Sequence, residues 1–155
     1  MKTLGIFFAT AMVWMVGATA AEAAGDGGYH PHHVAVFVGG TDSAHEGSGV
    51  SLGIDYEYRW HQNFGVGVLA EYADLNHAAW IVGVPLFVHP YRGLKLLVMP
   101  GVEFTNNHSN FLTRVGVGYD FHIGDWSITP SANVDFVAGA NNLVFGLGVM
   151  DQSPM

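Results

Sequence analysis

The side chains that could do chemistry in this sequence are its nine histidines and thirteen carboxylates. Three of the histidines lie in polar segments between apolar runs and have acidic or hydroxyl residues close by in the sequence: His45, His77 and His108. If those segments converge in space, imidazole and carboxylate groups could bind a divalent metal. Histidine is also an ordinary loop residue, so we expect no metal and no other cofactor, and retain the three histidines as candidate ligands only.

A second set of charged residues alternates with apolar ones along the chain. It comprises Arg59, Lys95, Glu103, Arg114, Asp120 and Asp135. If Phe104 opposes Phe111 across the link between them, Lys95 lies opposite Asp120, and Arg114 lies diagonal to Glu103 and to Asp135. Charges of mixed sign on one narrow face predict a charge-paired interior, which would act either as a structural plug or as a gate for small ions.

The elements that must position these charges are strands, because the dominant hydrophobic period is two. In residues 49–60, for example, one face carries only aliphatic and aromatic side chains and the other only small or charged ones. Segments with this pattern are 34–41, 49–60, 64–74, 78–89, 94–105, 111–123, 126–138 and 143–149. Eight sequential strands with short links predict an antiparallel up-and-down meander. Pro85, Pro100 and Pro130 fall inside these strands, and we expect local bulges there.

Aromatic residues bracket the apolar face at both ends. One belt is Tyr58, Trp60, Phe64, Phe121 and Trp126; the other is Tyr72, Trp80, Phe104, Phe111 and Phe136. Belts ten residues apart on a tilted strand are separated by roughly 25 Å, the height of the apolar band of a membrane barrel. The charged face is otherwise rich in Gly and Ser, which suits a narrow lumen. The fold class predicted is therefore all-β: an eight-stranded antiparallel up-and-down transmembrane β-barrel.

Composition and the chain ends fit an exported protein. The net charge of −8 gives no electrostatic basis for nucleic-acid binding, and the absence of Cys excludes disulfides and thiolate chemistry. Residues 1–23 have the charged, apolar and small-residue regions of a cleaved signal peptide. We expect a flexible leader over 24–32, the barrel over 33–150 and a tail over 151–155.

Two stretches carry a resemblance to a known family: GVSLGIDYEYRWHQNFGVGVLAEY (49–72) and FLTRVGVGYDFHIGDWSITPSANVDFV (111–137). They resemble the small eight-stranded outer-membrane barrels of Gram-negative bacteria, the group that contains the membrane domain of OmpA and OmpX. The resemblance implies contact with outer-membrane lipids and insertion by the barrel-assembly machinery. It also implies periplasmic termini and polar loops outside the cell.

The expected function is that of a non-enzymatic outer-membrane protein with a structural or surface-interaction role. Two alternatives remain open. One is a lipid-modifying enzyme, because His108-Ser109-Asn110 is similar to the His-x-Ser-Asn stretch of outer-membrane lipid A deacylases, although adjacent strand residues point to opposite faces. The other is a soluble, lipocalin-like periplasmic barrel that binds an apolar ligand.

Overall fold

The computed structural model describes residues 31–43, 47–106 and 108–151, and the chain there is almost wholly β-strand. The strands are β1 (His32–Ser43), β2 (Gly47–His61), β3 (Phe64–Asp74), β4 (Ala78–Gly83), β5 (Leu86–Tyr91), β6 (Leu94–Phe104), β7 (Ser109–Tyr119), β8 (Phe121–Ile123), β9 (Trp126–Val137) and β10 (Ala140–Asp151). The expected signal peptide, most of the leader and residues 152–155 of the tail lie outside the described residues.

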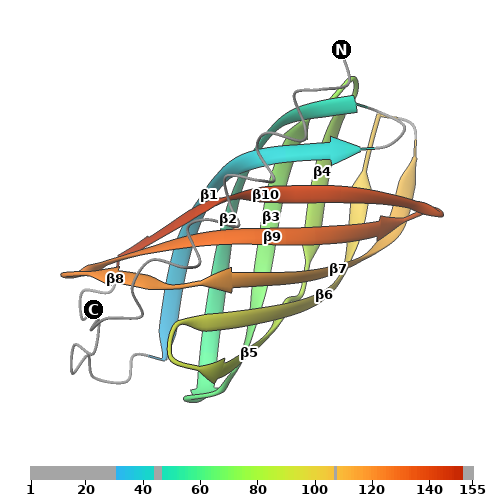
Figure 1. The fold of residues 1–155 in the computed structure, drawn as a ribbon. Helices are drawn as coiled ribbons and strands as arrows, with labels where there is room; N and C mark the ends of the chain where they lie inside the picture. The colour runs from blue at the N-terminus through green and yellow to red at the C-terminus, as the bar shows by residue number, and fades with distance from the viewer. Residues whose placement is uncertain (1–30, 44–46, 107, 152–155) are drawn as a thin grey trace.

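The strands form one closed antiparallel sheet (Figure 1). β4 and β5 follow one another along a single strand position between β3 and β6, and β7 and β8 likewise share the position beside β9. Nine residue pairs join β10 to β1 and close the sheet. The described chain is therefore an eight-stranded antiparallel barrel, as predicted.

The register of the strands gives the barrel its tilt. A path through paired residues leaves β1 at His32 and returns to β1 at Asp42, ten residues further along. The intermediate residues are Tyr58, Val66, Leu86, Val98, Val115, Val134 and Leu143. A stagger of about 33 Å over eight strands spaced about 4.8 Å apart corresponds to a tilt of roughly 40°.

The prolines interrupt the ladder without shifting its register, so the expectation of bulges at them is wrong. Gly83 pairs with Gly101 and Leu86 with Val98, which is the same register on both sides of Pro85 and Pro100. The carbonyl groups of Pro85 and Pro100 still accept hydrogen bonds, from the amides of Gly67 and Val84. The missing proline N–H groups coincide with two gaps in the ladder: one between β4 and β5, and one between β7 and β8 opposite Pro130. Register shifts occur instead beside the turns, between Arg59 and His61 and between Val88 and Tyr91.

The two ends of the barrel differ. The turn end carries the two-residue links 62–63, 92–93 and 124–125, together with the start of β1 and the end of β10. Gly93 and Gly124 have φ values of 74° and 63° there, a conformation that L side chains rarely adopt. The loop end carries the β1–β2, β3–β4, β6–β7 and β9–β10 links.

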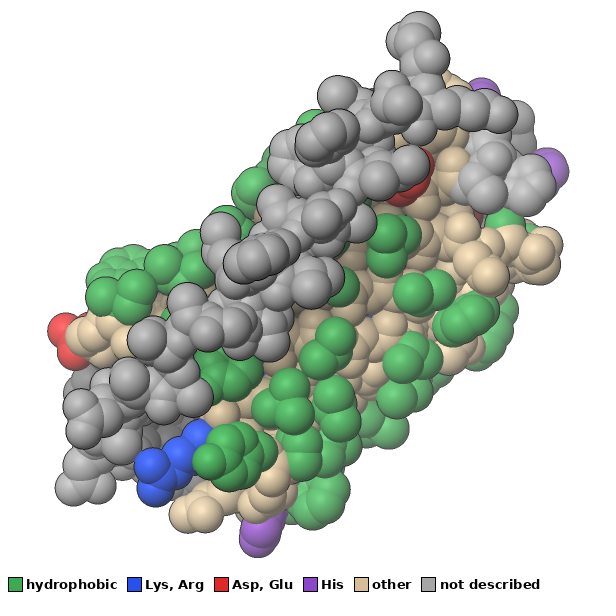
Figure 2. Space-filling view, in the orientation of Figure 1, with side chains coloured by type: hydrophobic (Ala, Val, Ile, Leu, Met, Phe, Trp, Pro, Cys, Tyr) green, Lys and Arg blue, Asp and Glu red, His purple; other side chains and the backbone are tan. Residues whose placement is uncertain are grey.

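The outer surface is apolar, and Figure 2 shows hydrophobic side chains along the wall of the barrel. Thirty large hydrophobic side chains of the described residues are exposed, most of them at alternate strand positions. The buried polar groups point inward: of the described charged residues, five carboxylates and Arg114 are buried. No helix in the described residues is long and apolar enough to cross a membrane.

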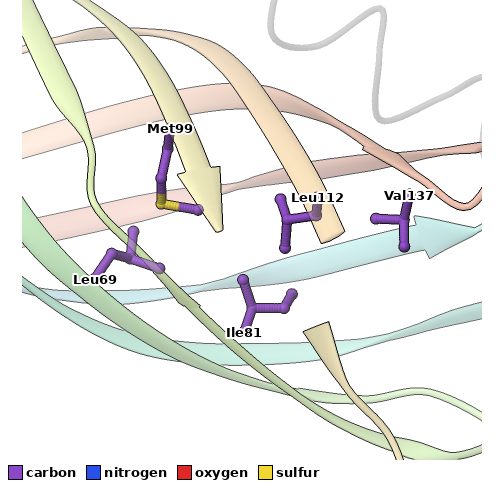
Figure 3. Close-up of a cluster of buried hydrophobic side chains, with 5 residues drawn as sticks. All are labelled: Leu69, Ile81, Met99, Leu112 and Val137. Carbon is purple, nitrogen blue, oxygen red and sulfur yellow. The ribbon is translucent and has the colours of Figure 1, made fainter. Parts of the chain in front are cut away.

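A small apolar cluster also occupies the interior (Figure 3). It consists of Leu69, Ile81, Met99, Leu112 and Val137, contributed by five different strands. Met99 and Leu112 are completely buried. The lumen is therefore filled by side chains, as expected for eight strands.

Candidate functional site: the charged lumen

A cluster of charges near the turn end is organised around Glu57, whose side chain is fully buried. Its carboxylate accepts a hydrogen bond of 2.9 Å from Nε of Arg59 and lies 3.2 Å from Nζ of Lys95. The ring Nε2 of His89 is 2.8 Å from the same carboxylate. Arg59 also reaches Asp120, at 3.9 Å. We call these five residues the Glu57 cluster.

Neighbouring residues make room for the Glu57 cluster and orient it. A Cβ atom added to Gly65 would come within 2.3 Å of the Glu57 carboxylate, so the absence of a side chain on β3 creates the space that Glu57 occupies. Nζ of Lys95 lies 4.0 Å from the centre of the Phe87 ring, a cation–π distance. Asp120 accepts a 2.6 Å hydrogen bond from the hydroxyl of Thr129.

A second cluster lies closer to the loop end. Arg114 on β7 binds Asp135 on β9 through two hydrogen bonds, of 2.6 and 2.7 Å, and binds Glu71 on β3 through a third, of 2.5 Å. The three side chains are only 1–2% exposed. A fork of guanidinium N–H groups matches a carboxylate bidentately, which makes this the geometrically better defined of the two clusters. We call it the Arg114 cluster.

A cavity of about 70 Å³ separates the two clusters. Its lining includes Asp55, Lys95, Glu71, Arg114 and Asn133. Oε1 of Glu71 is buried and has no hydrogen-bond partner in the protein. A volume of this size and polarity suits one or two water molecules, which would satisfy that oxygen.

The register between β6 and β7, which occupy the fifth and sixth strand positions, differs by two residues from the one predicted from the sequence. Phe104 opposes Ser109 rather than Phe111, and Lys95 opposes Gly118 rather than Asp120. Lys95 forms its ion pair with Glu57 on β2. Arg114 lies directly opposite Asp135, not diagonal to it.

The six charged residues proposed from the sequence divide between the two clusters, with one exception. Arg59, Lys95 and Asp120 belong to the Glu57 cluster, and Arg114 and Asp135 to the Arg114 cluster. Glu103 is buried near the loop end. It lies opposite Asn110, whereas Arg114 lies opposite Met99, so Glu103 and Arg114 are four residues apart in register and not diagonal as predicted.

Glu57, Glu71 and His89 were not among the candidate site residues. The period-two alternation places Glu57 and Glu71 on the small, polar face, which was the available signal for them. No local pattern distinguishes His89, because its partner lies 32 residues away in the chain.

The predicted aromatic belts lie on the outside of the barrel. Nine of the ten residues are exposed: Tyr58, Trp60, Phe64, Trp80, Phe104, Phe111, Phe121, Trp126 and Phe136. Tyr72 is partly covered by Trp80, with ring centroids 5.2 Å apart. Trp60 and Phe64 stack at the turn end with a centroid distance of 6.4 Å.

The candidate metal ligands are not brought together among the described residues. His45 lies outside those residues, and His77 and His108 are exposed. Within the described ranges no group of three or more His, Asp or Glu side chains could hold a metal ion.

Comparison with known proteins finds similar solved structures but no match in sequence. No family model matches the chain, and no curated protein matches it. Among solved structures, Neisserial surface protein A is similar with a TM-score of 0.63 and 10% identity, over 79% of this chain and 97% of that one. The N-terminal β-barrel domain of Pseudomonas aeruginosa OprF is similar with a TM-score of 0.57 and 13% identity, over 77% and 96%.

A third similar structure is Ail, the attachment invasion locus protein of Yersinia pestis, in complex with the heparin analogue sucrose octasulfate. Its TM-score is 0.55 and its identity 11%, over 77% of this chain and 96% of Ail. Identities this low show the fold alone. The fold is that of the small eight-stranded transmembrane barrels, which confirms the structural side of the resemblance found in the sequence.

Proposed function

We propose that this protein is an integral outer-membrane protein, exported through a cleaved signal peptide and inserted by the barrel-assembly machinery. The observation that carries the proposal is the inverted arrangement of side chains. Aliphatic and aromatic groups cover the outside of the closed barrel, whereas eight of the ten charged strand residues whose side chains are described are buried or half-buried. A barrel in water would present the opposite arrangement, because exposed apolar surface on this scale is unfavourable there.

The aromatic side chains support a defined position in the bilayer. Trp60 and Trp126 lie at the turn end of the outer surface, and Trp80 lies toward the loop end. Tryptophan and tyrosine favour the interface between hydrocarbon and headgroups, so two such belts on one barrel fit a spanning orientation. Outer-membrane lipids would contact the apolar band between them.

The role we propose for the lumen is that of a non-conducting structural plug. Both charge clusters are cross-linked by hydrogen bonds and ion pairs, and the apolar cluster of Figure 3 fills the space beside the Arg114 cluster. The protein would then be non-enzymatic and act through envelope structure or through surface contacts of its loop end.

A lipid-modifying enzyme is the first alternative. Its candidate residues are both exposed: His108 immediately precedes β7, and Ser109 is the first residue of β7. Adjacent residues at a strand position point to opposite faces, which does not favour proton transfer between them. Mass spectrometry of lipid A from cells with and without the protein tests this alternative; a lost acyl chain would establish it.

A soluble, ligand-binding barrel is the second alternative. Apolar-ligand sites usually enclose about 300–1,000 Å³, and the interior cavity here has about 70 Å³ and charged walls. Protein that stays in solution without detergent would support this alternative over the membrane protein.

The deciding experiment separates outer-membrane fractions and runs them on SDS gels with and without boiling. We expect the protein in the outer-membrane fraction, with a mobility that changes on boiling because the closed barrel resists SDS when cold. Reconstituted vesicles should show no added permeability to small sugars. Protein found in the periplasmic fraction, or an unboiled band identical to the boiled one, would contradict the proposal.

A further inference from the structure

A second hollow lies at the loop end of the barrel, separate from the cavity between the charge clusters. It has a volume of about 230 Å³ and opens outward. Its lining comes from the ends of five strands and from the β9–β10 turn: Ser43, Glu103, Asn110, Val137, Ala138, Gly139, Ala140 and Asn142. We call it the mouth pocket.

The polar groups of the mouth pocket come as two neighbouring pairs. Ser43 on β1 pairs in register with Asn142 on β10. Glu103 on β6 pairs in register with Asn110 on β7. The two pairs come from different strands, so a residue with a hydroxyl, one with a carboxylate and two with amides line one space.

One of these oxygens needs a hydrogen-bond donor. Oδ1 of Asn142 is buried and has no hydrogen-bond partner in the protein, and the residue as a whole is only 7% exposed. An unpaired buried acceptor is unfavourable, because it has lost its hydration without gaining a protein donor. A ligand that brings N–H groups into the pocket would remove that cost.

The charge around the pocket favours a cation. From the Arg114 cluster outward, the described residues include five carboxylates, those of Asp42, Glu71, Asp74, Glu103 and Asp135. Arg114 is the one Lys or Arg among the described residues of this half, and it is already bound to Glu71 and Asp135. The remaining described Lys and Arg residues, Arg59, Arg92 and Lys95, lie toward the turn end. The mouth pocket therefore lies in a field of net negative charge.

The mouth pocket is open to the outside and closed on its inner side. Val137, which lines the pocket, also belongs to the buried apolar cluster with Leu112 and Ile81 (Figure 3). A group that enters from the loop end thus meets packed aliphatic side chains at the floor. The arrangement suits a bound ligand better than a permeating ion.

We propose that the mouth pocket binds a primary alkylammonium group. The ammonium carries three N–H donors and a positive charge, which match the Glu103 carboxylate, the amide oxygen of Asn142 and the hydroxyl of Ser43. The attached methylene groups fit against Val137, Ala138 and Ala140. The source of the group is either a small free diamine or the side chain of a lysine in a peptide.

The test uses the full chain folded in detergent micelles, with folding of every variant checked by the gel shift on boiling. Calorimetric titration with 1,5-diaminopentane should show saturable binding at one site. Glu103→Gln should weaken binding about tenfold, because one charge-assisted hydrogen bond contributes enough for such a change. Asn142→Asp, which keeps the shape of the residue and adds a negative charge, should tighten binding.

Asp74→Asn provides the matched control. It removes one negative charge at the same end of the barrel, outside the residues that line the pocket, and should change the affinity less than twofold. An equal loss of affinity in Glu103→Gln and Asp74→Asn would overturn the proposal, because it would show that the amine responds only to the overall negative charge of the loop end. Weaker binding by Asn142→Asp would overturn it as well, and so would the absence of saturable binding.

Two further probes distinguish the source of the ammonium group and test whether the site prefers an ammonium group to a metal cation. Nα-acetyl-lysine amide should bind as well as 1,5-diaminopentane if the natural ligand is a peptide lysine, and clearly more weakly if it is a free diamine. If calcium bound with the expected dependence on the variants and neither amine bound, the result would contradict an ammonium site. Either amine result, with the expected pattern across the variants, supports the proposal.

Discussion

Arg114 and Asp135 lie directly opposite each other on β7 and β9, and the guanidinium of one binds the carboxylate of the other through two hydrogen bonds of 2.6 and 2.7 Å. The third bond from Arg114 reaches Glu71 on β3, 43 residues away in the sequence. One buried cation thus joins three strands across the lumen.

Replacing Arg114 should destabilise the barrel strongly. Arg114→Met leaves Glu71 and Asp135 buried without a counter-charge, and we expect a loss of about 3–5 kcal/mol in the free energy of unfolding. Arg114→Lys keeps the charge but loses the bidentate geometry, and should cost less. Urea unfolding in phospholipid vesicles measures both. Arg92→Met, in an exposed turn, is the control; equal stability of Arg114→Met and wild type would contradict the prediction.

Gly65 and Glu57 should behave as a coupled pair. A Cβ atom on Gly65 would lie 2.3 Å from Oε1 and 2.9 Å from Cγ of Glu57, so one of the two side chains must move. We expect Gly65→Ala to cost about 1–3 kcal/mol through overpacking. In a Glu57→Ala background the same change should cost close to nothing. A double-mutant cycle in the unfolding assay measures this coupling, and purely additive effects would rule it out.

A charged substitution on the outer surface should lower the free energy of unfolding by an amount that depends on its depth in the bilayer. Val115 is exposed midway along β7, between Val98 and Val134 of the neighbouring strands. Val115→Arg should cost about 2–4 kcal/mol in a bilayer. Tyr91→Arg, at the exposed end of β5 beside the turn, should cost about 0–1 kcal/mol. Equal costs at the two sites in vesicles would argue against a lipid-facing wall.

The β9–β10 turn contains a strained alanine. Ala138 has a φ of 47° and Gly139 a φ of 82°, so both central residues of this two-residue link have positive φ. Such turns favour Asn at the first position, because its side chain tolerates the left-handed region. Ala138→Asn should therefore stabilise the barrel by about 0.5–1 kcal/mol, whereas Ala138→Val should destabilise it. An Ala138→Asn variant that is less stable than wild type, or an Ala138→Val variant that is as stable as wild type, would show that the turn does not limit stability.

Much of the fold could be predicted from the period-two pattern, because the alternation assigns each side chain to a face. The strand Phe64–Asp74 was predicted to the residue, and Leu94–Phe104 and Trp126–Val137 to within one residue at the C-terminal end. The interruptions at Pro85 and after Tyr119 divide two of the eight expected strands, which propensity alone did not indicate. The face assignments survive these gaps because the register is the same on either side of each.

The partners of the lumen charges were harder to predict. A shift of one residue in register would have moved every side chain to the wrong face, but a shift of two leaves each face unchanged. The pattern therefore cannot distinguish Phe104 opposite Phe111 from Phe104 opposite Ser109, and the structure has the second. That difference of two residues places Gly118 rather than Asp120 opposite Lys95. The ion pair of Lys95 is instead with Glu57 on β2, across the lumen.

The sequence by itself determined which side chains face outward and which face inward, because alternation along a strand is a local property. It also determined that the other inward-facing side chains are small, which leaves room for the charged ones. Only the tertiary structure decided which charges meet. Contacts such as Arg114 with Glu71 join strands that are not neighbours in the sheet, and they depend on closure of the barrel with a stagger of ten residues. That stagger is a property of all eight strand pairings together, so no single segment of the sequence contains it.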